Sequence, residues 1–93
     1  MKVYKMKHIP TGFYYKPSNS NGNLSKKGKA YVNMKPNINW TYRIRIKFFF
    51  KTTPNKFQEE LINYFKLDLE NKYYINVCVN TLPSDWEIVE ITE

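Results

Sequence analysis

Residues 42–51 alternate between apolar and cationic side chains with a period of two. The even-numbered positions are apolar or aromatic: Tyr42, Ile44, Ile46, Phe48 and Phe50. The odd-numbered positions hold four cations and one ring: Arg43, Arg45, Lys47, Phe49 and Lys51. Because successive side chains of a strand point to opposite faces, this pattern predicts a strand with one face in the core and the other face cationic. The fold must therefore contain a sheet that is covered on one side.

Shorter patterns predict the other strands. Alternating or aromatic runs indicate strands at residues 3–8, 13–15, 30–34, 73–80 and 86–92. In the last of these the apolar positions change parity, so that strand needs a bulge or two buried faces. Residues 17–28 are rich in Ser, Asn, Gly and Lys, and they predict an exposed loop.

One helix is expected after the alternating strand. Thr53 is the predicted N-cap and Pro54 occupies the first helical position, where its missing N–H costs no hydrogen bond. An apolar stripe then extends to about Glu70 through Phe57, Leu61, Tyr64, Phe65 and Leu69. The sequence thus predicts an α+β fold, in which one helix (about residues 54–70) packs on one face of a mostly antiparallel sheet of about five strands. A chain of 93 residues has room for one domain, which we expect to span residues 1–93.

Charge is divided sharply along the chain. Residues 1–58 contain 13 of the 15 lysines and arginines and no acid, while all eight acids lie between Glu59 and Glu93. A basic segment of this kind favours an acidic partner, such as nucleic acid or an acidic protein. We expect no membrane partner. Contact between the acidic part of one copy and the basic part of another remains a possible route to a homo-oligomer.

Two regions are candidate binding sites for the acidic partner. The first is the outward face of the alternating strand, made of Arg43, Arg45, Lys47, Phe49 and Lys51, where a ring among cations is suited to nucleic acid. The second is the lysine loop, defined by Lys26, Lys27 and Lys29. The alternative is that the strand face is only the solvated side of a sheet and the loop only a connection. A solvated face usually carries both acidic and basic side chains, whereas this face contains no acid.

Catalytic and metal-binding patterns are not found in the sequence. His8 is the only histidine and Cys78 the only cysteine, so no zinc site can be built from His and Cys, and both residues are expected to be structural. The carboxylates do not converge by helical spacing, and the cationic part of the chain has none. We therefore expect a protein without enzymatic activity, cofactor or metal. Trp40 and Trp86 are expected in the core.

The chain shows no signal for secretion or membrane insertion. It has no apolar run of about 18 residues, and Met1–Pro10 lacks the apolar core of a signal peptide. The expected location is the cytoplasm.

Two segments resemble small uncharacterised bacteriophage proteins. They are Lys7–Tyr15, which reads K-H-I-P-T-G-F-Y-Y, and Asn23–Tyr31, which reads N-L-S-K-K-G-K-A-Y. The resemblance implies a phage accessory protein acting in the host cell or associated with the virion, and it transfers no catalytic residue. Such a protein would bind nucleic acid. Alternatively, it would inhibit or modulate a host enzyme by protein–protein contact, as an anti-defence protein does, or serve as a minor virion component.

Overall fold

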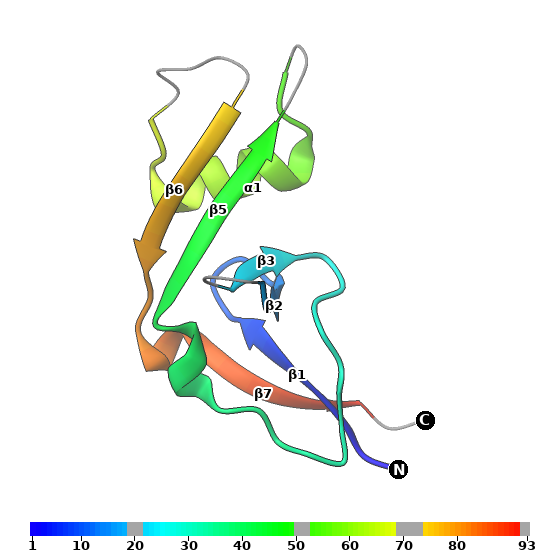
Figure 1. Ribbon diagram of the computed structural model, residues 1–93. Coiled ribbons are helices and arrows are strands. Elements are labelled where there is room, and N and C mark those ends of the chain that lie inside the picture. The colour runs from blue at the N-terminus through cyan, green and yellow to red at the C-terminus, as the bar shows by residue number, and fades with distance from the viewer. Residues whose placement is uncertain (19–21, 50–52, 69–73, 92–93) are drawn as a thin grey trace.

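The computed structural model describes residues 1–18, 22–49, 53–68 and 74–91. It has one α-helix and seven strands in these residues, which confirms the α+β class (Figure 1). In chain order the elements are β1 (Val3–His8), β2 (Tyr14–Lys16), β3 (Asn23–Ser25), β4 (Tyr31–Val32), the 3-10 helix η1 (Ile38–Thr41), β5 (Arg43–Phe49), α1 (Lys56–Phe65), β6 (Tyr74–Asn80), the 3-10 helix η2 (Pro83–Asp85) and β7 (Trp86–Ile91).

The larger sheet, here called sheet A, has five antiparallel strands with β1 at its centre. β7 pairs with the whole of β1, from Val3 opposite Ile91 to His8 opposite Trp86. β2 and β4 share the other edge of β1, one near each end, and β3 pairs with β2. The register of β1 and β7 runs through six residue pairs without a bulge. Of the two predicted solutions for the parity change in β7, the structure has the second: both faces of the strand are partly covered, since Ile88 and Val89 are each half-buried.

The second sheet consists of β5 and β6, paired antiparallel over seven residues. Its connection to sheet A is a backbone contact at Gly22, which forms a parallel bridge with Ile44 and accepts a hydrogen bond from the Arg45 N–H at 2.8 Å. A side chain at Gly22 does not fit, because a Cβ there would lie 1.9 Å from Cε1 of the buried Tyr15 ring. Glycine at this position lets the two sheets approach each other.

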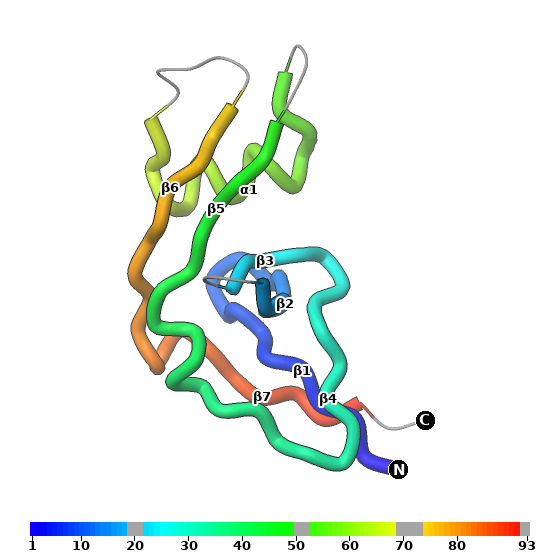
Figure 2. The backbone as a smooth tube through the Cα atoms, in the orientation of Figure 1, coloured from blue at the N-terminus to red at the C-terminus, as the bar shows by residue number. Residues whose placement is uncertain are grey.

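A single group of buried residues extends through both sheets. Ile44 and Ile46 of β5 are 0% exposed, and they belong to the same core as Leu61 of α1 and Met6 of β1. Figures 1 and 2 show α1 crossing behind β5 and β6, so the helix covers the inner face of this sheet. The predicted core parity of the alternating strand is thus confirmed at Ile44 and Ile46. It is wrong at Tyr42, which lies before β5 and is 65% exposed.

The helix boundaries differ from the prediction. Asn55, not Thr53, is the N-cap, and it forms a capping box with Gln58: the Asn55 side chain accepts from the Gln58 N–H, and the Gln58 side chain accepts from the Asn55 N–H. Such reciprocal bonds satisfy two donors at once, which makes Asn55 the better cap. The helix ends at Phe65, before the predicted Glu70, because Lys66 adopts a left-handed conformation with φ of 52°.

Three further predictions were wrong in detail. The predicted loop at residues 17–28 contains β3, in which Leu24 is 3% exposed and joins the core. The predicted strand at residues 30–34 is reduced to Tyr31–Val32. Trp86 is buried as expected, whereas Trp40 is 46% exposed because it lies on η1 and contacts the Tyr31 ring from outside.

His8 packs in the core as an aromatic residue would. Its side chain is 0% exposed, and its ring centroid lies 4.9 Å from that of Trp86, 5.3 Å from Tyr64 and 5.8 Å from Phe65. Nδ1 lies 2.7 Å from Thr11 Oγ1, while the buried Nε2 has no hydrogen-bond partner among the described residues. Burial lowers the pKa of His8 below its usual 6.5, and the charge of Asp85 opposes this effect in part.

The capping box predicts unequal effects of two neighbouring substitutions. Asn55→Ala should lower the free energy of unfolding by about 1 kcal/mol, because it removes a side-chain acceptor from the helix N-terminus. Thr53→Ala, at the exposed position that the sequence pattern favoured, should change it by less than about 0.5 kcal/mol. Urea denaturation followed by far-UV circular dichroism measures both values, and equal losses would contradict the assignment of the cap.

The buried imidazole predicts a loss of stability in mild acid. Since the pKa of His8 is lower in the folded chain than in the unfolded chain, the unfolded state binds the proton more readily between the two values. The free energy of unfolding should therefore fall as the pH decreases below about 6.5. In His8→Phe the fall between about pH 7 and pH 5 should be smaller. Urea denaturation at a series of pH values measures the free energy of unfolding of both proteins. If it falls equally in both, the imidazole is not the cause.

Candidate nucleic-acid interface

The side of the β5–β6 sheet that faces away from α1 gathers cations, amides and rings. We call it the outer face. Cross-strand register places eight residues there in four pairs: Arg43 with Asn80, Arg45 with Cys78, Lys47 with Asn76, and Phe49 with Tyr74. None of these eight residues in the described strands is acidic. The structure thus brings four of the five predicted residues of the alternating strand onto one surface, while Lys51 lies outside the described residues.

The three cations of the outer face differ in their exposure to solvent and in their hydrogen bonds. Arg43 and Lys47 are exposed, and Arg45 between them is half-buried. The Arg45 Nη1 donates to Oδ1 of Asn76 at 2.9 Å, and its buried Nε has no hydrogen-bond partner among the described residues. Asn76 therefore holds the central guanidinium in place, and the two outer cations are available to a ligand from solvent.

An aromatic pair lies at the end of the outer face farthest from sheet A (Figure 1). The Phe49 side chain is 70% exposed, and its ring centroid is 4.5 Å from that of Tyr74 with an interplanar angle of 33°. The backbone beneath this pair is connected to the helix, because Gln58 Nε2 donates to the Phe49 carbonyl at 3.3 Å. The pair is therefore a surface of two rings on a supported strand end.

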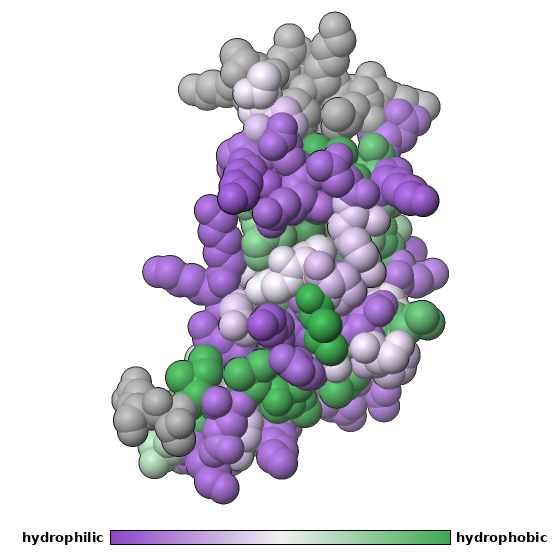
Figure 3. Space-filling view, turned by 180° about the vertical axis from the view of Figure 1, so that it is seen from behind, coloured by the Kyte–Doolittle hydropathy of each residue, from purple (hydrophilic) through white to green (hydrophobic). Residues whose placement is uncertain are grey.

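The acids of the helix lie on the other side of the β5–β6 sheet. Leu61 of α1 packs in the core with Ile44 and Ile46, whose side chains point opposite to the cations. Figure 3, the view from behind, shows hydrophilic residues over the upper part of the molecule, where α1 lies. Glu59 and Glu60 are exposed on this helix. The sheet separates them from the outer face, so they do not neutralise its cations directly.

The lysine loop is not continuous with the outer face. Lys26 and Lys27 are exposed in the turn that follows β3, and Figure 1 places this turn on the side of β3 away from β6. Lys29 is also exposed, with its ammonium 5.6 Å from the Tyr31 ring centroid. Gly28 closes the turn with φ of 67° and donates its N–H to Ser25 Oγ at 2.6 Å. The two predicted basic regions are therefore separate surfaces.

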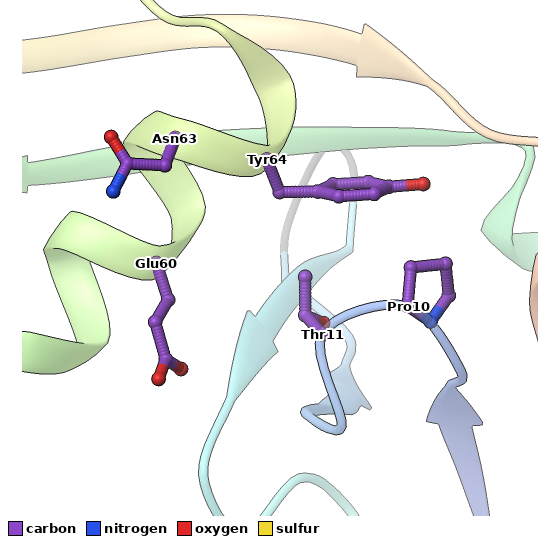
Figure 4. Close-up of a pocket in the computed structure, with 5 residues that line it drawn as sticks. All are labelled: Pro10, Thr11, Glu60, Asn63 and Tyr64. Carbon is purple, nitrogen blue, oxygen red and sulfur yellow. The ribbon is translucent and has the colours of Figure 1, made fainter.

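A pocket of about 420 Å³ lies between α1 and the turn after β1 (Figure 4). The described residues that line it are Pro10, Thr11, Glu60, Asn63 and Tyr64. The Tyr64 ring extends from the helix over the turn that carries Pro10 and Thr11. The pocket contains no cation among its described lining residues, so it does not extend the basic surface.

Sequence reasoning missed the β6 half of the outer face. Tyr74, Asn76 and Asn80 share a parity that was visible in the sequence, but their position opposite the cations depends on the register of two strands separated by α1. No turn rule sets that register, because β5 and β6 are not joined by a hairpin. Cys78 also lies on this face and is half-buried.

Other kinds of site receive no support from the described residues. No group of three or more His, Cys, Asp or Glu side chains is placed to hold a metal ion in the described part of the chain. Among the same residues, no helix has the length and apolar character needed to cross a membrane.

Comparison with known proteins supplies no relative for this chain. No protein-family model, curated protein or solved structure matches it. The function must therefore be argued from the geometry of the outer face.

Proposed function

We propose that this protein binds nucleic acid through the outer face of β5 and β6, with little dependence on sequence. The observation that supports this proposal is the row of Arg43, Arg45 and Lys47 on a face without acids in the described strands. Cationic rows of this kind bind phosphates by charge and release counterions, which does not require a particular base sequence.

The spacing of the row suits a phosphate backbone. Residues two apart on a strand are separated by roughly 6.5 to 7 Å. The three cations therefore extend over roughly 13 to 14 Å along one direction. A chain of phosphates lying along β5 could meet each cation in turn, with Arg45 already oriented by Asn76. The lysine loop would add a second, separate contact to a ligand long enough to reach it.

A role as a phage-type accessory protein agrees with this proposal. Such a protein would act in the host cell, or in association with the virion, without catalysis or a cofactor. Its acidic partner would be DNA or RNA.

A second candidate function is protein–protein contact, in which the same cations occupy an acidic surface of a host enzyme or phage protein. Trp40 is 46% exposed and Tyr42 is 65% exposed, beside the start of β5. Exposed aromatic residues are enriched at protein interfaces. A stoichiometric complex that survives nuclease treatment would distinguish this function from nucleic-acid binding.

Charge removal on the outer face tests the main proposal. A double variant, Arg43→Gln with Lys47→Gln, should bind a fluorescently labelled oligonucleotide more weakly than the unmodified protein at about 50 mM salt. The slope of log K against log salt is negative, and each lost phosphate contact should make it less steep by about 0.7 to 0.9, hence by about 1.5 for the pair. Fluorescence anisotropy over a salt series measures both effects.

A matched control removes the same charge elsewhere. Lys2→Gln with Lys35→Gln takes two cations from the start of β1: Lys2 directly precedes this strand, and the Lys35 ammonium lies 5.9 Å from the ring centroid of Tyr4. The start of β1 is far from the β5–β6 sheet (Figure 1). This variant should keep most of the affinity and the salt slope. Equal losses in both double variants, or no binding by the unmodified protein at about 50 mM salt, would overturn the proposal. A third variant, Lys26→Gln with Lys27→Gln, measures the contribution of the lysine loop.

A further inference from the structure

We infer that the outer face selects single-stranded nucleic acid by stacking a base on the pair of Phe49 and Tyr74. This inference rests on the proposed nucleic-acid binding, and it adds the form of the ligand and the residues that recognise it. It assigns Phe49 as the contact ring and Tyr74 as its support.

The exposure of Phe49 is the first argument. A phenylalanine that is 70% exposed leaves most of its apolar surface in water, which is unfavourable unless a ligand covers it. The core does not need this ring, because the neighbouring Phe48 points to the inner face and packs against the core. The Phe49 ring is therefore available to a flat apolar surface from solvent.

The support beneath the ring is the second argument. Tyr74 lies 4.5 Å away, centroid to centroid, and its ring is tilted by 33° against that of Phe49, so the two rings are in contact. The hydrogen bond from Gln58 to the Phe49 carbonyl holds the strand end against α1. A ring restrained in this way loses less conformational freedom when a base stacks on it.

The position of the pair relative to the cations is the third argument. Phe49 follows Lys47 by two residues on the same face, so its ring lies at the end of the cationic row. A strand whose phosphates follow Arg43, Arg45 and Lys47 would bring a base to Phe49 at that end. Aromatic rings beside a basic groove are the usual means by which proteins bind single strands without reading their sequence.

Duplex nucleic acid cannot use this ring in the same way. The faces of paired bases are covered by their neighbours in the stack, and only base edges are accessible in the grooves. A duplex can therefore meet the cations of the outer face but not the ring face of Phe49. The preference for a single strand thus depends on stacking, whereas charge contributes to the binding of single strands and of duplexes.

The test separates stacking from charge with two probes of equal length. One is a labelled oligothymidylate of about 15 nucleotides, and the other is an abasic sugar–phosphate strand that keeps the charges and lacks the bases. The unmodified protein should bind the oligothymidylate more tightly by roughly 5- to 150-fold. Phe49→Leu should remove most of this preference and leave the affinity for the abasic strand unchanged.

Two variants complete the experiment. Tyr42→Leu removes a ring that is 65% exposed at the opposite end of β5, and it should keep the preference for bases. Tyr74→Leu should reduce the preference, since it removes the support of Phe49. Retained binding of the abasic strand shows that each variant is folded.

The outcomes test base stacking on Phe49 separately from charge-based binding of nucleic acid. If Phe49→Leu keeps the full preference for bases, or if the unmodified protein binds both probes equally, the stacking role is wrong and the proposed charge-based binding stands. If the unmodified protein binds neither probe, nor the corresponding duplex, the proposed function is wrong as well. Loss of the base preference in Phe49→Leu, with the preference kept in Tyr42→Leu, supports the inference.

Discussion

The burial of Ile44 and Ile46 is the constraint on which the rest of the structure depends. Both side chains are fully covered, and the two-residue repeat of a strand then directs Arg43, Arg45 and Lys47 to the opposite side. Covering the inner face requires α1 and sheet A together. The cationic face is therefore a direct result of the same alternation that builds the core.

The β5–β6 sheet separates the acids of α1 from the cations of β5, whereas in sheet A the register places Glu87 opposite Lys7. In the sequence, 13 of the 15 lysines and arginines precede Glu59, and all eight acids lie between Glu59 and Glu93. In the structure, Glu59 and Glu60 lie on α1, which Figure 1 shows behind the β5–β6 sheet. The cations of β5 alternate with the buried Ile44 and Ile46, so they lie on the side away from this helix. Low-dielectric side chains lie between them, so the field of the outer face is not cancelled locally.

The predictable part of the site is the part that depends on a single strand. The alternation in β5 was sufficient to place Arg43, Arg45, Lys47 and Phe49 on one face. It could not identify Tyr74 as the neighbour of Phe49, because the pairing of β5 with β6 is set by tertiary packing around α1. Local composition was misleading at β3, where polar neighbours on both sides concealed the buried Leu24.

The pairing of β1 with β7 has a consequence for how the chain is made. β1, the central strand of sheet A, is synthesised before its longest neighbour, β7, and all the other described elements lie between them in the chain. Until then one edge of β1 has unpaired N–H and C=O groups, which could pair with another chain. Lys5 and Lys7 lie on this strand, and lysines on an open edge discourage such pairing. The lysines of β1 thus protect its open edge until β7 pairs with it.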